Sequence, residues 1–386
     1  MYNWALERKK STYEANGKSL SKYDIQKLLT LEKHTERQWL NDILRDTLVN
    51  AIWNMDAAYQ NFFRRVKNGE EKKGFPKFKS RRTAKRVFHV TACLMRVSED
   101  CRSIKVPKLG WVRMSKPLRF DGKMVGSVAI SEEAGKWYAS LTFEVEIPDP
   151  PDRSSDLAIG IDVGIKQLMT LSDGKRYENP KATYHYERLL ARVQRQLSRK
   201  QKGSNHWKKA KLRVQRVQKR IKDVRVNAAH QATAEIARDY GLVAMENLNA
   251  KGMMANRHLA KAVSDSNFHR LRQQLSYKTA WSGSELRLVD RWFPSSKLCS
   301  VCGCINDNLT LKDRMWICDC GAIHDRDLNA AKNILAEALR MADESAVTGR
   351  GGIGVSSPPD EASNRHLYKT YIPELTGTPC VGQIAL

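Results

Sequence analysis

Two closely spaced cysteine pairs constrain the fold of this chain more than any other feature. Two residues separate Cys299 from Cys302, and one residue separates Cys318 from Cys320. Such pairs, separated by about the length of a hairpin, are typical of a zinc ribbon with four thiolates around one ion. Cys304 remains a competing ligand because the second pair is one residue shorter than usual. We favour one structural zinc bound by the first four, since a site with four thiolates leaves no position open for substrate.

The charge of the chain indicates a polyanionic partner. Its 386 residues carry a formal net charge of +25, and a protein that neutralises phosphates gains affinity by releasing counterions. A protein whose surface is merely basic is the alternative. No run approaches the roughly 20 apolar residues of a membrane-spanning helix and no signal peptide opens the chain, so we expect no membrane association. The clustering of five of the eight cysteines within residues 299–320 favours metal binding in a reducing compartment over disulfides.

The first 150 residues change character twice. Apolar residues recur at three- and four-residue steps from Leu40 to Phe62, which predicts an amphipathic helix. A basic segment at 66–86 then interleaves cations with Phe75 and Phe78, a composition suited to nucleic acid, although a solvated loop is the alternative. Short β-branched and aromatic runs from 87 to 147 predict a small antiparallel sheet or barrel. The expected nucleic-acid contacts in the basic segment are Lys77, Lys79, Arg81 and Arg82.

A second basic region is predicted to be a pair of helices. Apolar stripes within 184–234 are interrupted by Gly203-Ser204-Asn205, the expected turn. The outer faces are rich in arginine and lysine, and helices so uniformly charged repel each other unless phosphates balance the charge. Arg213, Arg216 and Arg220 are therefore further candidate nucleic-acid contacts. The segment 148–156, rich in Pro, Ser and Asp, is the best candidate for a linker before this region.

Three acidic residues occupy similar local settings. Asp162 lies within a predicted strand, Glu246 follows a second strand, and Asp327 lies at the start of a helix. Each position alone is ordinary. If neighbouring elements of one sheet brought them together, they could bind two Mg²⁺ ions, which prefer oxygen ligands, and such a pair of ions supports phosphodiester hydrolysis.

The helix start separates two neighbouring acids. Asp325 can cap the helix, which leaves Asp327 in the first turn, where the helix dipole favours a carboxylate. Asp325 stays open as the alternative third acid. Asn329 and Asn333 could add hydrogen bonds to the groups that hold the metal.

Several segments resemble the TnpB family, the transposon-encoded relatives of type V CRISPR effectors. The closest segments are GIDVGIKQLMTLSDG, VAMENLNAKGMM, FPSSKLCSVCG and CGAIHDRDLNAAKNIL. Weaker similarity in YNWALERKK, GFPKFKSRR and VPKLGWVRM extends it over residues 1–340. The family usually has a strand-bearing segment before the YNWAL helix, so either part of the barrel is missing or it closes differently. The resemblance places the D-E-D triad of the family, which holds two catalytic Mg²⁺ ions, on Asp162, Glu246 and Asp327.

The resemblance also implies a multidomain fold that combines α+β and α/β parts, with an RNase H-like (RuvC) core. The expected order is a helical recognition lobe with its basic loop at 1–86, a wedge-like β-barrel at 87–150, a RuvC-like nuclease core with the basic helical pair at 157–292, a zinc ribbon at 293–323 and a final RuvC helix at 324–342. Residues 343–386 lack periodicity and are expected to form a disordered tail.

The function implied is that of an RNA-guided DNA endonuclease that cuts both strands of its target. Its partners would be a guide RNA derived from the transposon end and double-stranded DNA with a flanking motif, bound by a protein monomer in the prokaryotic cytosol near the nucleoid. Two alternatives remain, an RNA-guided repressor that binds without cutting and a DNA-joining transposase.

Overall fold

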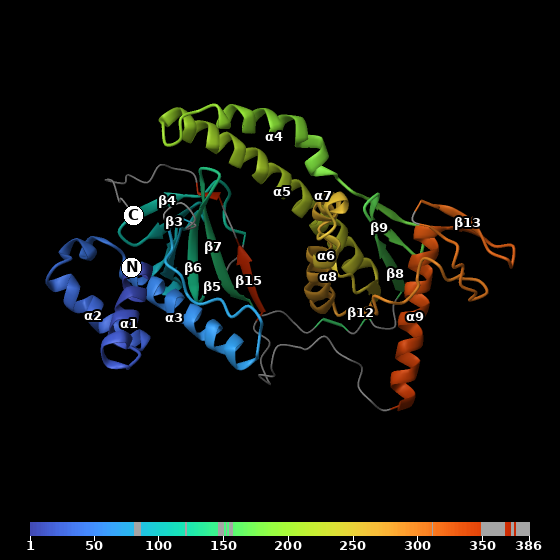
Figure 1. The fold of residues 1–386 in the computed structure, drawn as a ribbon, viewed down its shortest axis with the longest axis horizontal. Helices are drawn as coiled ribbons and strands as arrows, with labels where there is room; N and C mark the ends of the chain where they lie inside the picture. The colour runs from blue at the N-terminus through green and yellow to red at the C-terminus, as the bar shows by residue number, and fades with distance from the viewer. Residues whose placement is uncertain are drawn as a thin grey trace. The chain divides into compact units, whose positions relative to one another are not determined.

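The computed structural model describes residues 1–80, 86–119, 122–145, 150–151, 153, 157–310, 312–348, 367–371 and 374–375. The chain divides into two compact units, one formed by Met1–Ile147 with Asn364–Leu386 and the other by Pro148–Ser363 (Figure 1). The division falls beside the segment that the sequence indicates as a linker. In the part of the chain that the structure describes, no helix is long and apolar enough to cross a membrane.

The first unit begins with a helical subdomain. Its elements are α1 (Tyr2–Asn16), α2 (Lys22–His34), the short 3-10 helix η1 (Gln38–Asp42) and α3 (Arg45–Lys67). The predicted apolar stripe lies on α3, whose inner face buries Leu48, Ile52, Met55 and Tyr59 against Trp4 and Ile25. The amphipathic helix expected in this region is therefore confirmed, although it begins five residues later than its first apolar position.

An antiparallel sheet follows these helices. Its central strand β7 (Lys136–Val145) pairs along one edge with β6 (Ser127–Glu133) and β5 (Lys123–Met124), and β6 pairs with β1 (Val87–Thr91). A separate sheet contains β2 (Arg96–Val97), β3 (Ser103–Val106) and β4 (Gly110–Arg113), with the short helix η2 (Ala92–Leu94) before it. Val90, Ile104, Val128, Leu141 and Phe143 join both sheets in one core. Among the described strands the pairing stays open, so the predicted antiparallel sheet is present without a closed barrel.

The C-terminal segment contains two short strands. β15 (Leu367–Tyr371) and β16 (Glu374–Leu375) pair with the other edge of β7. The sequence LYKTY has the β-branched and aromatic composition of a strand, yet a run of five residues is too short to stand out from the aperiodic segment around it. Most of the tail expected at 343–386 lies outside the described residues.

A mixed sheet organises the second unit. Its order is β10 (Arg176–Glu178), β9 (Gln167–Leu171), β8 (Ala158–Val163), β11 (Leu242–Glu246) and β12 (Glu285–Val289). The first three strands are antiparallel, whereas β8, β11 and β12 are parallel. The turn Ser172-Asp173-Gly174 lies between β9 and β10.

Helices connect the parallel strands. Between β10 and β11 lie α4 (Ala182–Ser198) and α5 (Asn205–Asp239), which form the predicted basic pair and run side by side away from the sheet (Figure 1). Between β11 and β12 lie α6 (Ala250–Met253), α7 (Arg257–Ser266) and α8 (Phe268–Ser282). A hairpin of β13 (Met315–Ile317) and β14 (Ile323–Asp325) leads into α9 (Arg326–Thr348).

The two faces of the mixed sheet pack against different helices. Ile159, Ile161 and Met245 face a core that includes Ala232 and Ile236 of α5 and Leu271 and Leu275 of α8. Because side chains alternate along a strand, the residues between them face the opposite way. On that opposite face Ala244 and Val289 pack against Ile334 and Ala338 of α9. The face that carries α9 is also the face on which Asp162 and Glu246 lie.

Candidate carboxylate and cysteine sites

Strand register makes Asp162 and Glu246 neighbours. The parallel strands β8 and β11 pair residue by residue up to Ile161 opposite Met245. The next position on each strand is Asp162 and Glu246, and adjacent strands are about 4.8 Å apart. The two acids therefore meet at the carboxyl ends of adjacent parallel strands, where α/β sheets commonly place their functional groups.

A glycine lets helix α9 approach closely enough to bring the third acid. A Cβ atom at Gly160 would lie 2.0 Å from the carbonyl oxygen of Ala331, so only glycine fits at this crossing. Asp327 precedes Ala331 by four residues, about 6 Å along a helix, and Asp162 follows Gly160 by two residues, about 6.6 Å along a strand. Because these two lengths are similar, Asp327 at the start of α9 lies near Asp162 at the end of β8.

Asp325 caps α9 and is engaged elsewhere. Its Oδ1 accepts the backbone N–H of Asp327 at 3.1 Å and that of Leu328 at 3.0 Å, and its Oδ2 pairs with Arg176 at 3.0 Å. Burial raises the pKa of Asp325, but the Leu328 N–H and the Arg176 guanidinium outweigh it and hold this pKa below its usual value. Asp327 lies in the first turn of α9, the arrangement expected from the sequence.

The electrostatics of the three carboxylates favour a bound cation. Burial, followed by the Asp327 and Glu246 carboxylates, raises the pKa of Asp162 to about 7. Burial and the carboxylate of Asp290 raise the pKa of Glu246 to about 7. Negative groups held close together away from water resist ionisation, and a divalent cation relieves this repulsion. Carboxylate oxygens are the ligands that Mg²⁺ prefers, so the residues present fit a magnesium site.

The carboxylates are more widely spaced than a closed metal cage. Asp327 lies 3.2 Å from Arg314 and 3.4 Å from Arg326, and both guanidinium groups also lower the pKa of Asp162. Among the described residues, the ligand atoms of the four cysteines all lie within 4.8 Å of one another, whereas the three acids form no such group. The acids therefore share one neighbourhood without surrounding a single point.

Two charged residues near the three acids, Asp290 and Arg314, are not among the site residues that the sequence predicts. Asp290 directly follows Val289, whose register partner is Glu246, and Arg314 precedes the ribbon strand β13. Asp290 stands directly after the end of β12, and such a position past a strand end is a usable signal. Arg314 offered no signal because it is one of 67 lysines and arginines.

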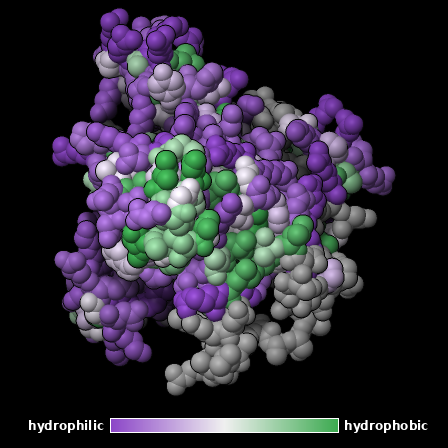
Figure 2. All heavy atoms as spheres, turned by 90° about the vertical axis from the view of Figure 1, so that its right-hand side faces the viewer, coloured by the Kyte–Doolittle hydropathy of each residue, from purple (hydrophilic) through white to green (hydrophobic). Residues whose placement is uncertain are grey.

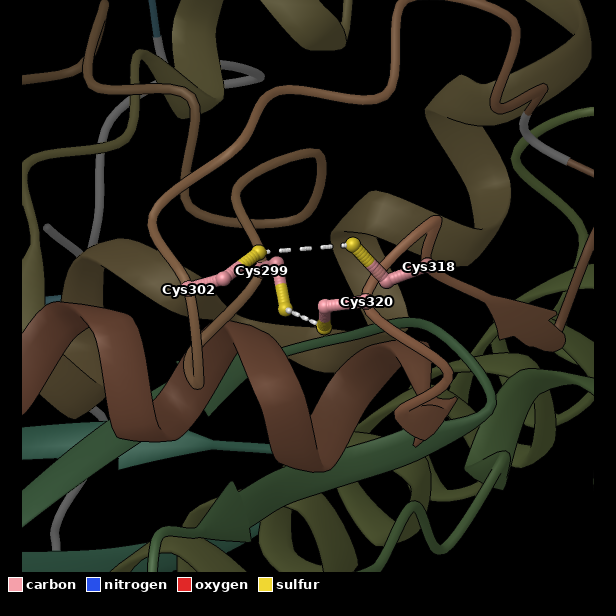
Figure 3. A group of neighbouring side chains, drawn as sticks. All are labelled: Cys299, Cys302, Cys318 and Cys320. Atoms are coloured by element: carbon pink, nitrogen blue, oxygen red, sulfur yellow. Dashed lines mark hydrogen bonds between the residues drawn. The ribbon is translucent and has the colours of Figure 1, made fainter.

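The four predicted zinc ligands lie together. Figure 3 shows the sulfurs of Cys299, Cys302, Cys318 and Cys320 turned toward one another, with Cys302 and Cys318 3.5 Å apart and Cys299 and Cys320 3.8 Å apart. Cys304 is outside the cluster and contributes its carbonyl oxygen to the Cys299 N–H. Gly321, at φ 84°, turns the shortened second pair. The cluster therefore has the donor set of a structural zinc site.

Local hydrogen bonds prepare one thiol for metal binding. Burial raises the pKa of Cys299, but the backbone N–H groups of Cys302 and Val301, with His324, lower it to about 6. The Nε2 atom of His324 lies 3.0 Å from this sulfur. Thiolates are the form that binds zinc, so the turn and the histidine favour the binding form before any metal arrives.

Asn329 and Asn333 join the cysteine turn to α9. The Ser300 N–H donates to Oδ1 of Asn329, whose Nδ2 donates to the Leu298 carbonyl, and Nδ2 of Asn333 donates to the Ser295 and Leu298 carbonyls. The expectation that these amides support the carboxylates is wrong, because both are buried against the ribbon. They attach the cysteine cluster to the helix that carries Asp327.

The ribbon hairpin has one buried and one exposed face. Trp316 and His324 are a register pair, and both are buried beside Cys299 and Cys318. Met315, Ile317 and Ile323 face the other way and are 60%, 66% and 68% exposed. Figure 2 views the molecule from the side that holds the ribbon and α9, and shows a hydrophobic area surrounded by hydrophilic side chains.

The expected nucleic-acid contacts divide between the two units. In the first, Lys77 is exposed, and the Lys79 ammonium lies 3.9 Å from the Tyr2 ring, while Arg81 and Arg82 lie outside the described residues. In the second, the three α5 arginines Arg213, Arg216 and Arg220 are exposed. The same helix buries Ala210, Val214 and Ile221 on another side, so the arginines lie on its outer surface.

Comparison with known proteins points to one group. A family profile described as "Probable transposase", OrfB_IS605, matches residues 142–257, and the profile "Cas12f1-like, TNB domain" matches residues 268–334. A protein of Streptomyces pristinaespiralis named "Putative RNA-guided DNA endonuclease" is 36% identical over 92% of this chain and 89% of its own length. The Escherichia coli K12 protein "Putative RNA-guided DNA endonuclease InsQ" is 31% identical over 91% of this chain and 89% of its own length.

A solved structure overlaps more loosely. The chain from "Cryo-EM structure of the Cas12f1-sgRNA-target DNA complex" is 17% identical, with a TM-score of 0.36 over 86% of this chain and 90% of that chain. A likeness of this size carries no argument about function.

Proposed function

Because this chain belongs to the OrfB_IS605 (TnpB) family, we propose that it is a magnesium-dependent, RNA-guided DNA endonuclease. The names of its relatives from Streptomyces and Escherichia coli contain the words "RNA-guided DNA endonuclease". The observation that carries the proposal is the meeting of Asp162, Glu246 and Asp327 on one face of the mixed sheet, with the electrostatic repulsion described above. The order of the sheet, an antiparallel hairpin followed by parallel strands, fits the RNase H-like core that the sequence resemblance implied.

The three acids are the proposed ligands of two magnesium ions. Bound in pairs, such ions activate the attacking water and stabilise the leaving 3′ oxygen of a phosphodiester. Glu246 and Asp162 are fixed by strand register, whereas Asp327 is paired with Arg314 and would have to leave that ion pair to hold a metal. Burial on the α9 face strengthens the attraction of the carboxylates for cations.

The cysteine cluster is the proposed site of one structural zinc ion. The zinc would tie the two cysteine turns together, and Asn329 and Asn333 connect the first turn to α9. In this way the zinc ribbon sets the position of Asp327 without taking part in the chemistry.

The proposed partners are a guide RNA from the transposon end and double-stranded target DNA with a flanking motif. Guide pairing would read the target sequence, while the protein binds backbone phosphates. The exposed arginines of α5 and the cation and aromatic surface near Lys79 are suited to this task. A protein monomer with its RNA, acting in the prokaryotic cytosol, is the simplest form of this assembly.

The test is the variant Asp162→Ala in the complex with guide RNA and target. We expect no cleavage of either strand, with guide and target affinity retained. Full cleavage by this variant would reject the proposal. A repressor that binds without cutting predicts no cleavage by the unmodified protein either, and a DNA-joining transposase predicts strand-transfer products on a donor DNA.

A further inference from the structure

A pocket of about 360 Å³ opens beside the carboxylates. Its floor is apolar, formed by Val163 and Met245 from the strand ends with Leu248 and Phe268. Glu246 lines it as well, although Val163, Met245 and Phe268 belong to the core on the face of the sheet opposite α9. The pocket therefore lies at the ends of β8 and β11 and meets the proposed magnesium site at Glu246. The volume lies within the usual range for small-ligand pockets, roughly 300–1,000 Å³. A ligand in this pocket would therefore lie next to Glu246.

The rim of the pocket is basic. Lys251, His269 and Arg272 line it together with Asn249, and all four belong to or flank the helices between β11 and β12. His269 lies in the first turn of α8, where the helix dipole adds positive potential. An apolar floor with a cationic rim suits a ligand that has one flat apolar part and one anionic part, as a nucleotide has.

Arg272 is held in place by the residue that follows Glu246. Its Nη1 donates to Oδ1 of Asn247, the residue after Glu246. The Asn247 N–H in turn donates to the Val289 carbonyl of the next strand at 3.0 Å. This chain of bonds fixes the guanidinium relative to the end of the sheet. A fixed guanidinium can bind phosphate oxygens through two parallel N–H groups.

We propose that this pocket binds the deoxynucleotide next to the scissile phosphate, with the base against the exposed Met254, over the buried Phe268 at the floor, and the outer phosphate at Arg272. Met254 also lines the pocket and is 46% exposed, so it is available to a base. The proposal rests on the proposed nuclease function and adds a substrate subsite to it. Glu246 would hold metal on one side of the scissile phosphate while the pocket fixes the nucleotide on the other.

The first test maps contacts directly. Target DNA with 5-iodo-2′-deoxyuridine next to the cut is bound to the Asp162→Ala protein and its guide RNA, irradiated, and analysed by peptide mass spectrometry. We expect cross-links at Met254, Phe268 or His269 from the nucleotide on one side of the cut, and none there from a label about ten nucleotides away. Cross-links from both adjacent nucleotides that fall only elsewhere would overturn the proposal.

The second test separates cleavage from binding. Met254→Trp fills the pocket from an exposed position, and Arg272→Ala removes its fixed cation. We expect each to lower the single-turnover cleavage rate about 10- to 100-fold, because misplacing the reacting phosphate has costs of this size, while target affinity stays within about twofold. Arg272→Lys should recover part of the rate because it restores a cation.

The matched control is Arg270→Ala. Arg270 lies on the same helix but does not line the pocket, so its variant should cleave at the unmodified rate. If Arg272→Ala lowers the melting temperature, Met254→Trp decides the question alone. Cleavage by Met254→Trp within about threefold of the unmodified rate would overturn the pocket proposal. In that case the loss of cleavage in Asp162→Ala would still stand, so the two proposals fail separately.

Discussion

The cysteine cluster and the carboxylate cluster bring their ligand groups together in opposite ways. The four sulfurs come from two tight turns within 22 residues, Cys299 to Cys320, and all lie within 4.8 Å of one another. The three carboxylates come from β8, β11 and α9, elements separated by up to 165 positions, and are more widely spaced. One cluster is local and closed, and the other is assembled by the fold and open.

The difference shows what each cluster can do. A closed cage of thiolates satisfies its ion completely and leaves no room for substrate. An open set of carboxylates keeps positions free for water and phosphate, but its charges repel until cations bind. The two clusters are joined physically, because Asn329 and Asn333 connect the cysteine turn to the helix that carries Asp327.

The largest effect is expected from the third acid itself. Asp327→Asn removes a proposed metal ligand, so we expect cleavage to fall by at least about a thousandfold, the scale of several kcal/mol of lost stabilisation in the transition state. Asp325→Asn is the matched control, because asparagine still caps a helix and the variant loses the same charge. It should cleave within about threefold of the unmodified rate. The reverse result would make Asp325 the third acid.

The close approach of α9 is the next test. Gly160→Ala places a methyl group against the Ala331 backbone, so α9 must shift and carry Asp327 with it. We expect about 1–3 kcal/mol of destabilisation and a loss of cleavage of about 100-fold. Ile159→Val costs about 0.5–1.5 kcal/mol on the opposite face without moving α9. Equal cleavage rates in the two variants would show that stability, not the position of α9, controls activity.

A smaller effect is expected from the zinc ribbon. Cys318→Ser should remove the zinc, measured as metal content per chain, and lower cleavage by about tenfold, because the ribbon then positions α9 less firmly. Cys304→Ser should keep both zinc and cleavage, since Cys304 lies outside the cluster. Asp162→Ala should keep its zinc as well. Loss of zinc in Cys304→Ser would assign the ligands differently.

The smallest effect is expected on the melting temperature of the metal-free protein when Asp162 is replaced. The pKa of Asp162 is raised to about 7, so its contribution to stability is complete below about pH 4 and is lost as the pH rises through 7. Asp162→Asn stays neutral, so in chelator at pH 8 we expect it to melt several degrees above the unmodified protein. At pH 4 the two should melt together. A difference that does not change with pH would remove the electrostatic argument for the acid cluster.

The two clusters differ in how far they can be predicted from the sequence. Spacing alone predicted the four cysteines, because their geometry is set within each turn. The three acids needed a family resemblance, since only the order β10-β9-β8-β11-β12 makes Asp162 and Glu246 neighbours, and strand order is not written in local periodicity. The amphipathic helix α3 and the basic helical pair are both visible from local patterns.

The features that the sequence does not predict depend on contacts between elements far apart in the chain. Asn329 and Asn333 were predicted to support the carboxylates, but packing directs both toward the ribbon. Arg314 reaches Asp327 only because the ribbon hairpin ends beside the start of α9. The pocket beside Glu246 brings together residues from 163 to 272 that no motif joins.

The most direct test of the carboxylate site is to count bound Mn²⁺ by electron paramagnetic resonance in RNA-free protein, comparing the unmodified chain with Asp162→Ala. Mn²⁺ favours the same oxygen ligands as Mg²⁺, and zinc should remain in the cysteine cluster of both proteins. We predict about two Mn²⁺ ions per chain in the unmodified protein and at least one fewer in the variant. Equal Mn²⁺ binding by the two proteins would contradict the assignment of Asp162, Glu246 and Asp327 as the metal site.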